Sequence, residues 1–148
     1  MKRSTAREIA VRLCFMLSET LEDPEVILSD MFENEHYSTL GEEDELFAEK
    51  PGKQIEYIRQ IVRGVGLHNA ELDEYIERYS VNWDFDRISR TALAIMKTAM
   101  FEVLYMPDIP NGVSINEAVE LAKKYEEPEV VPFVNGILGA FVKGESFE

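Results

Sequence analysis

The chain has 148 residues, of which 45% are hydrophobic and 30% charged. This composition is typical of a folded globular protein and argues against a disordered one. No apolar run approaches the roughly 20 residues that span a bilayer. Arg7, Glu8 and Arg12 interrupt the apolar pattern at the start of the chain, so it does not match a secretory signal. We therefore expect a cytoplasmic protein, in which the single Cys14 forms no internal disulfide and is a packed core thiol.

The net charge of −14 is concentrated in one segment of the chain. Residues 19–49 contain twelve carboxylates and no Lys or Arg, whereas the other residues carry 17 acids and 15 bases. The N-terminus has the opposite character, because its basic residues precede every acid except Glu8; they are Lys2, Arg3, Arg7 and Arg12. Such an asymmetry says more about binding partners than the total charge does. A polyanionic ligand therefore stays compatible with this acidic protein.

Apolar residues recur at helical spacing in the first half of the chain. The periodicity predicts helices over residues 3–18, 24–33, about 53–68 and 70–80. Between the second and third of these we expect a long acidic loop over about 34–50, partly helical around Leu46 and Phe47. Gly64-Val65-Gly66 lacks the preceding strand and the lysine of a phosphate-binding loop. We expect these glycines to permit close contact between helices instead.

The second half of the chain also shows only helical patterns. Helices are predicted over about 86–106, 114–125 and 130–143, and the first of them ends at the prolines that follow it. Ser114 and Glu117 fit a capping box that opens the second. We predict an all-α fold of about seven helices in one domain, residues 1–148. Its packed sub-bundles would cover about 1–80 and 84–148.

The sequence contains no recognisable catalytic or metal-binding constellation. His36 and His68 have no Cys or second His at ligand spacing, and the acidic run 42–45 lacks the alternating ligands of a calcium loop. We therefore expect no catalytic residue, no metal and no cofactor. What remains is binding: an arginine-bearing helix can contact phosphates, and aromatic side chains can stack on the bases of single-stranded RNA. The alternative is that the arginines are simply solvated and the aromatics belong to the core.

Residues 109–139 carry an ordered set of motifs, IPNGVSINEAVELAKKYEEPEVVPFVNGILG. The combination of Ile115-Asn116-Glu117-Ala118 with Phe133-Val134-Asn135-Gly136 resembles the signature of the NusB family. Leu72-Asp73, the stretch from Trp83 to Arg87, and Phe101-Glu102 resemble the family as well, as do Arg3 and Ala6-Arg7-Glu8. The resemblance spans nearly the whole chain and is weakest over residues 19–50.

The resemblance implies an all-α fold and a non-enzymatic role in bacterial transcription antitermination. Such proteins pair with the ribosomal protein NusE, bind the boxA element of nascent RNA within the RNA polymerase elongation complex, and support read-through of ribosomal RNA operons. The RNA-binding residues that it implies here are Lys2, Arg3, Arg7, Tyr125 and Phe133. The partner-binding residues that it implies are Phe15, Tyr79, Asp84 and Asp86. We expect a monomer or a weak homodimer.

Physical reasoning gives part of the signature a structural role instead. Asn116 and Asn135 would be buried amides bonded to helix ends or to each other, and Gly136 and Gly139 would let two helices approach closely. The presumed RNA face also departs from the family. Its arginines are sparse, and the loop before Phe133 is acidic. Because fewer phosphate contacts weaken binding, we predict weak RNA affinity for the isolated protein.

Two other functions compete with this interpretation. The acidic segment favours a protein-interaction module that keeps the fold but has little intrinsic RNA affinity. A related helical domain also precedes the catalytic domain of some ribosomal RNA cytosine methyltransferases. The sequence contains no βαβ pattern and no glycine-rich cofactor loop, which argues against the enzyme.

Overall fold

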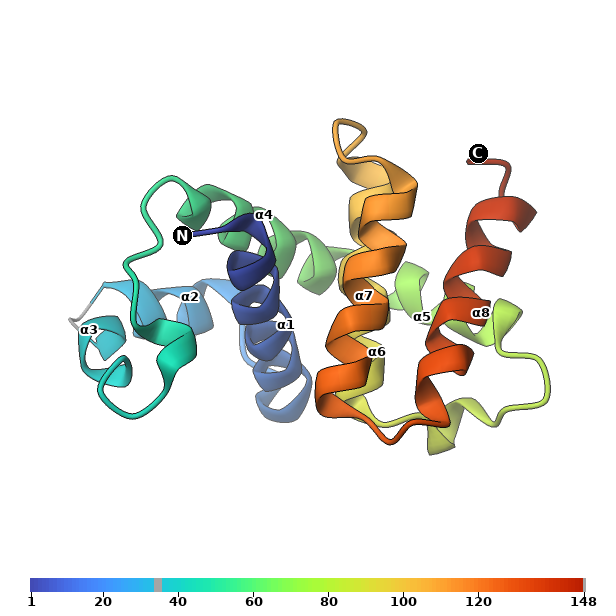
Figure 1. Cartoon of the computed structure of the whole chain (residues 1–148), viewed down its shortest axis with the longest axis horizontal. Coiled ribbons are helices and arrows are strands. Elements are labelled where there is room, and N and C mark those ends of the chain that lie inside the picture. Colours follow the sequence, from blue (N-terminus) through green and yellow to red (C-terminus); the bar gives the residue numbers. More distant parts are fainter. Residues whose placement is uncertain (34–35, 148) are drawn as a thin grey trace. The chain divides into compact units, whose positions relative to one another are not determined.

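The computed structural model describes residues 1–33 and 36–147, and every regular element within them is helical (Figure 1). Eight α-helices and two short 3₁₀ helices occur in this part of the chain, and no strand. The all-α prediction is therefore confirmed. The described residues include no helix that is long and apolar enough to cross a membrane.

The chain divides into two compact units, Met1–Leu67 and His68–Glu148. The predicted sub-bundles, about 1–80 and 84–148, place the helix over residues 69–79 in the first sub-bundle. In the structure this helix belongs to the second unit. It packs against helices that follow it in the chain, which explains why the boundary lies before it and not after it.

The first unit is built around the pairing of its first and last helices. Its elements are α1 (Arg3–Thr20), α2 (Pro24–Phe32), α3 (His36–Leu40), η1 (Glu45–Phe47) and α4 (Gln54–Leu67). Helix α1 packs along α4, and α2 contacts both of them. Fully buried side chains at helical spacing form the α1–α4 contact, among them Ile9, Leu13, Ile58 and Ile61. Cys14 is buried in the core, as predicted.

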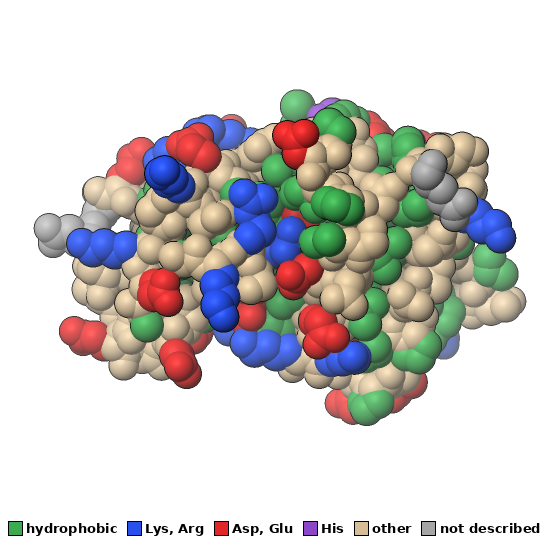
Figure 2. Space-filling model, turned by 45° about the horizontal axis from the view of Figure 1, so that its top comes forward, with side chains coloured by type: hydrophobic (Ala, Val, Ile, Leu, Met, Phe, Trp, Pro, Cys, Tyr) green, Lys and Arg blue, Asp and Glu red, His purple; other side chains and the backbone are tan. Residues whose placement is uncertain are grey.

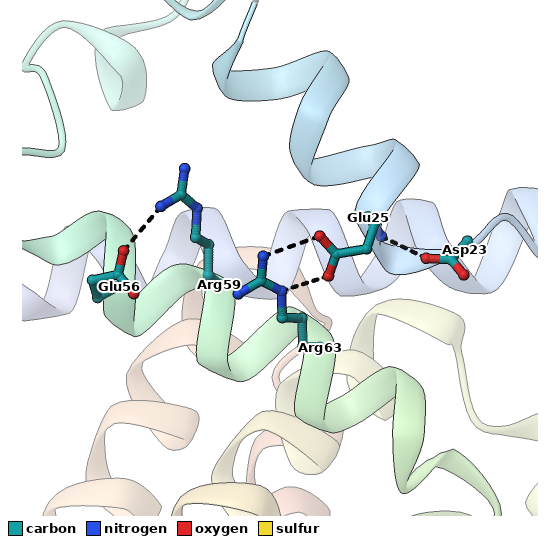
Figure 3. Close-up of polar contacts among 5 residues, drawn as sticks. All are labelled: Asp23, Glu25, Glu56, Arg59 and Arg63. Atoms are coloured by element: carbon teal, nitrogen blue, oxygen red, sulfur yellow. Dashed lines mark hydrogen bonds and ion pairs between the residues drawn. The ribbon is translucent and has the colours of Figure 1, made fainter.

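An exposed ion pair joins α2 to α4 at the surface of this unit (Figure 3). Asp23 caps α2 by accepting a hydrogen bond from the backbone N–H of Glu25 at 2.8 Å. The Glu25 carboxylate then accepts two hydrogen bonds from the Arg63 guanidinium, at 2.5 and 3.0 Å. The hydrogen bond from Arg63 is the main reason why the pKa of Glu25 lies below its ordinary value.

Gly66 lies where α4 approaches the start of α2. A methyl group at Gly66 would come within 2.6 Å of the Pro24 ring and 3.3 Å of the Leu17 side chain. The predicted role of this glycine in close helix contact is therefore confirmed.

The acidic segment is more ordered than the predicted long loop, of which residues 34 and 35 lie outside the described residues. It contains α3 and η1, the latter at the position where partial helix was expected. The Tyr37 ring contacts the rings of both Phe32 and Phe47, with a centroid distance of 5.6 Å in each pair. The Tyr37 hydroxyl also donates to the backbone carbonyl of Glu49 at 2.7 Å. The scattered apolar residues of this segment thus form a small core that its many charges conceal in the sequence.

The second unit consists of α5 (Asn69–Tyr79), η2 (Phe85–Arg87), α6 (Arg90–Tyr105), α7 (Asn111–Tyr125) and α8 (Val130–Gly144). Helices α6, α7 and α8 pack against one another, and α5 packs on α6 and α8. Leu72, Ile76, Ile95, Met96 and Phe141 are among its fully buried side chains.

Two predicted helix starts in this unit are wrong. Helix α6 begins at Arg90 and not near residue 86, because the Ser89 hydroxyl caps it by accepting from the N–H of Ala92 at 3.0 Å. Helix α7 begins at Asn111, which places Ser114 inside the helix, where it is fully buried. Ser114 and Glu117 therefore form no capping box. Pro110 occupies the position before α7, and its fixed φ of −59° suits a helix start.

The structural role predicted for the family signature is also corrected. Asn116 and Asn135 are exposed on α7 and α8, and neither side chain forms a hydrogen bond with any of the described residues. Gly136 and Gly139 are exposed, and an added methyl group would meet no atom within 4 Å. These polar and small residues lie on the outer surface of α7 and α8, where no core packing requires them.

Candidate nucleic-acid and partner interface

Arg3 is held in place by two side chains of α4. Its Nε donates to Gln54 Oε1 at 2.7 Å, and its guanidinium carbon lies 4.2 Å from the centroid of the Tyr57 ring. The Tyr57 side chain is buried, whereas Arg3 is exposed. A guanidinium has five N–H donors, so the bond to Gln54 leaves others that can face a ligand. Arg3 is thus an exposed cation whose orientation is already restricted.

Lys2 lies beside Arg3 and is exposed. The N-terminal ammonium group of Met1 pairs with Glu49 at 3.1 Å. This contact and the Arg3–Gln54 hydrogen bond place residues 49–54 alongside the start of α1, as Figure 1 shows near the N-terminus. The face drawn in Figure 2 exposes several Lys and Arg side chains with Asp and Glu side chains among them.

Arg7 differs from Arg3 because its side chain is only 3% exposed. Its guanidinium carbon lies 5.6 Å from the centroid of the same Tyr57 ring. The family resemblance implies that Arg7 contacts RNA phosphates, and a side chain that is 3% exposed offers a phosphate very little surface. Arg7 follows Arg3 by about one helical turn, but residue spacing within one helix does not reveal a contact with Tyr57 of another helix.

Arg12 is engaged by the acidic segment. Its Nη1 lies 2.6 Å from Asp44 Oδ2, and its Nη2 lies 4.0 Å from Glu8. Part of the positive charge of α1 is therefore neutralised within the first unit. Phe15, a predicted partner-binding residue, is half-buried on the same helix.

Tyr79 of α5 is bonded to the end of α8. Its hydroxyl donates to the Glu145 carboxylate, which also accepts from Arg78 Nη1 at 2.9 Å. The bond to Glu145 is the main cause that raises the pKa of the Tyr79 hydroxyl above its ordinary value. The Tyr79 ring also lies edge-on to Phe141, with a centroid distance of 6.2 Å. A partner that contacts Tyr79 would thus meet a half-buried ring whose hydroxyl is already occupied.

The loop between α5 and α6 presents apolar side chains next to carboxylates. Val81 is 72% exposed and Trp83 is 43% exposed, which is unusual for large apolar residues. Asp84 and Asp86 are exposed beside them, and Asp84 caps η2 by accepting from the N–H of Asp86 at 3.1 Å. The centroid of the Trp83 ring lies 4.3 Å from the centroid of the Phe133 ring on α8.

The structure therefore joins Phe133, which was predicted to bind RNA, to the stretch predicted to bind the partner. We call the surface formed by Val81, Trp83, Asp84, Asp86 and Phe133 the Trp83 patch. Tyr125, the other aromatic RNA candidate, is half-buried at the end of α7, with Lys124 Nζ 5.6 Å from its ring centroid.

Three residues of these surfaces were not predicted as site residues. Gln54 and Tyr57 lie within the helix predicted over residues 53–68, and Trp83 lies in the stretch from Trp83 to Arg87 that resembles the family. The first two act across the α1–α4 contact, which residue spacing within one helix does not show. A tryptophan in a break between helices, next to two aspartates, was a signal that could have identified the Trp83 patch.

The family of the protein follows from comparison with known proteins. A model described as the NusB family matches residues 4–143. The chain belongs to the NusB family. Two relatives carry the name transcription antitermination protein NusB. That of Clostridium kluyveri is 36% identical over 155 residues, which covers 100% of this chain and 99% of the relative. That of Thermoanaerobacter sp. is 39% identical over 149 residues, covering 100% and 95%.

Solved NusB structures have the same fold. T. maritima NusB matches with a TM-score of 0.77 and 30% identity, over 97% of this chain and 92% of that chain. NusB from Aquifex aeolicus matches with a TM-score of 0.72 over 99% and 91% of the two chains. Its identity is 24%, so it supports the fold alone. The predicted membership of the NusB family is confirmed.

Proposed function

We propose that this NusB-family protein is a non-enzymatic transcription antitermination factor of the bacterial cytoplasm. It binds boxA-type single-stranded RNA together with the ribosomal protein NusE, and it supports read-through transcription of ribosomal RNA operons by RNA polymerase. Membership of the family and the name shared by the relatives support the antitermination role. In this proposal the protein acts as a monomer or a weak homodimer.

The observation that carries the RNA-binding part is the exposed and oriented Arg3. Its contacts with Gln54 and Tyr57 restrict the guanidinium before a ligand arrives, which lowers the entropic cost of binding. Lys2 and Arg3 then contact phosphates directly. Arg7, which is buried and lies near the same Tyr57 ring, supports this arrangement as a positioning residue. Tyr125 is the proposed stacking residue for a base.

The Trp83 patch is the proposed docking surface for NusE. Exposed aromatic residues supply much of the binding energy at protein interfaces. Asp84 and Asp86 surround them with negative charge that suits a basic ribosomal protein. In this proposal Phe133 belongs to the same surface because it already contacts Trp83. Phe15 and Tyr79 are the other proposed partner contacts.

Few cations are available for RNA in the proposed site, since Arg7 is buried and Arg12 is paired with Asp44. We therefore expect weak RNA binding by the isolated protein and stronger binding when NusE is present. A nanomolar dissociation constant at physiological salt without NusE would contradict this expectation.

Fluorescence anisotropy with a boxA-like RNA and a scrambled RNA, with and without NusE at two salt concentrations, tests the proposal. Sequence-selective binding that strengthens with NusE and weakens in Arg3→Gln supports it. Arg63→Gln is the matched control, because Arg63 is already neutralised by Glu25. Equal affinities for the boxA-like and scrambled RNAs, together with an affinity that Arg3→Gln does not change, would refute the RNA site.

The second candidate function is a protein-interaction module with little intrinsic RNA affinity. The burial of Arg7 and the pairing of Arg12 favour it, because both reduce the cationic surface. Tight NusE binding with no RNA selectivity, in the presence or absence of NusE, would establish this alternative.

A further inference from the structure

We infer that Lys50 and Lys53, in the turn that precedes α4, extend the RNA-backbone site beyond α1. This inference rests on the proposed function and adds to it a second chain segment that contacts phosphates. The RNA strand would follow a basic surface that begins at Lys2 and Arg3 and continues over residues 50–53. We call these four cations the two-helix basic surface.

The contacts of the chain terminus place the four cations together. Met1 is paired with Glu49, the residue before Lys50, and Arg3 is bonded to Gln54, the residue after Lys53. Adjacent Cα atoms are only about 3.8 Å apart, so both lysines lie next to residues that touch the N-terminus.

A defined turn carries the two lysines. Gly52 adopts a φ of +56°, a conformation that favours glycine, and the N–H of Gln54 bonds to the carbonyl of Pro51 at 3.0 Å. Lys50 and Lys53 are exposed on either side of this turn. Their backbone positions are therefore fixed, while their side chains stay accessible to a ligand.

The local charge balance distinguishes these lysines from the other cations of the segment. Arg59 pairs with Glu56 at 2.9 Å and Arg63 pairs with Glu25, as Figure 3 shows. Glu49 is paired with the N-terminal ammonium group. By contrast, Lys2, Lys50 and Lys53 form no ion pair with any of the described residues.

Arg3 is likewise bonded to a neutral amide and stacked on a neutral ring. The two-helix basic surface is thus a local excess of positive charge in a protein whose net charge is −14. Because an acidic protein repels nucleic acid at long range, a compact unneutralised surface of this kind is where a phosphate chain binds most favourably. Phosphate contacts of this type contribute affinity without reading the base sequence.

The test compares two double variants of the whole chain. Each removes two positive charges from residues 50–63. Lys50→Gln/Lys53→Gln removes two unneutralised lysines, and Arg59→Gln/Arg63→Gln removes two arginines that are already ion-paired. Binding of boxA-like and scrambled RNA is measured by anisotropy over a range of salt concentrations, with NusE present. Arg3→Gln is measured in parallel, and circular dichroism checks the helix content and melting temperature of every variant.

We expect the lysine double variant to bind both RNAs about tenfold more weakly at low salt, since each exposed contact contributes modestly. The slope of log K against log salt should fall by about 1.4, at about 0.7 for each phosphate contact with a single strand. The arginine double variant should change the affinity by less than about twofold.

Two results would overturn the inference in different ways. If Arg3→Gln weakens binding but the lysine variant matches the arginine control, the proposed function stands and the extension of the site is wrong. If the wild-type protein binds neither RNA with NusE present, the proposed RNA site and its extension both fail.

Discussion

The Trp83 indole lies against the Phe133 ring, with the ring centroids 4.3 Å apart and the planes inclined by 34°. This contact links the loop after α5 to the first turn of α8. It also connects a residue predicted to stack on RNA with a stretch predicted to bind a protein. RNA and NusE are therefore both candidate ligands of this aromatic surface. Substitutions in it distinguish between the two.

Trp83→Ala is expected to weaken NusE binding by roughly thirtyfold, because truncation of a central aromatic at an interface costs about 2 kcal/mol or more. The RNA affinity of the isolated protein should stay within about twofold of wild type, because Trp83 is not among the proposed RNA contacts and residues outside the hot spot contribute little. Isothermal titration calorimetry with NusE and anisotropy with RNA measure the two effects. Val113→Ala is the control, since Val113 is 44% exposed on α7 outside the patch. An unchanged NusE affinity would remove the Trp83 patch from the proposal.

Gln54→Ala should weaken RNA binding several-fold while leaving the melting temperature nearly unchanged. The substitution removes the acceptor of the Arg3 Nε hydrogen bond without removing any charge. Loss of this restraint increases the side-chain entropy that Arg3 loses on binding, by about 0.5–1.5 kcal/mol. Anisotropy titrations measure the change, and Gln60→Ala, at an exposed position of the same helix, is the control. Equal affinities of the two variants would show that Gln54 does not position Arg3.

The sequence was sufficient to predict the fold class because apolar spacing reports directly on helical faces. The sequence was less reliable at helix ends, because one capping residue or proline decides where a helix begins. Helix α6, which Ser89 caps, begins four residues after the expected point at about residue 86, and α7, which Pro110 precedes, begins three residues before Ser114. The burial of Arg7 was not predictable either, because it depends in part on Tyr57, which is fifty residues away in the chain. Contacts between helices decide which cations stay exposed.

Glu25→Gln is expected to lower the melting temperature at neutral pH and to lose its effect in acid. The Arg63 hydrogen bond lowers the pKa of Glu25 in the folded protein below the ordinary value of 4.5. The carboxylate therefore stabilises the fold above pH 4.5, and this contribution disappears as the pH falls through the lowered pKa.

Thermal melts of wild type and Glu25→Gln between pH 7 and pH 3 measure this convergence. High salt should narrow the difference at neutral pH, because both side chains are at the surface. Glu22→Gln, which alters an exposed carboxylate just before α2, should follow the wild-type curve at every pH. A constant difference between Glu25→Gln and wild type across the pH range would show that the ion pair does not cause it.

Gly66→Ala and Gly139→Ala should change stability in opposite directions although both add one methyl group to a helix. At Gly66 the methyl group would lie 2.6 Å from the Pro24 ring, which cannot rotate away, so overpacking should cost about 1–3 kcal/mol. At Gly139 it meets no atom within 4 Å, so the higher helix propensity of alanine should add roughly 0.5–1 kcal/mol. Urea denaturation of the two variants gives both values. If Gly66→Ala were as stable as Gly139→Ala, the close approach of α2 and α4 at this glycine would not be a feature of the protein in solution.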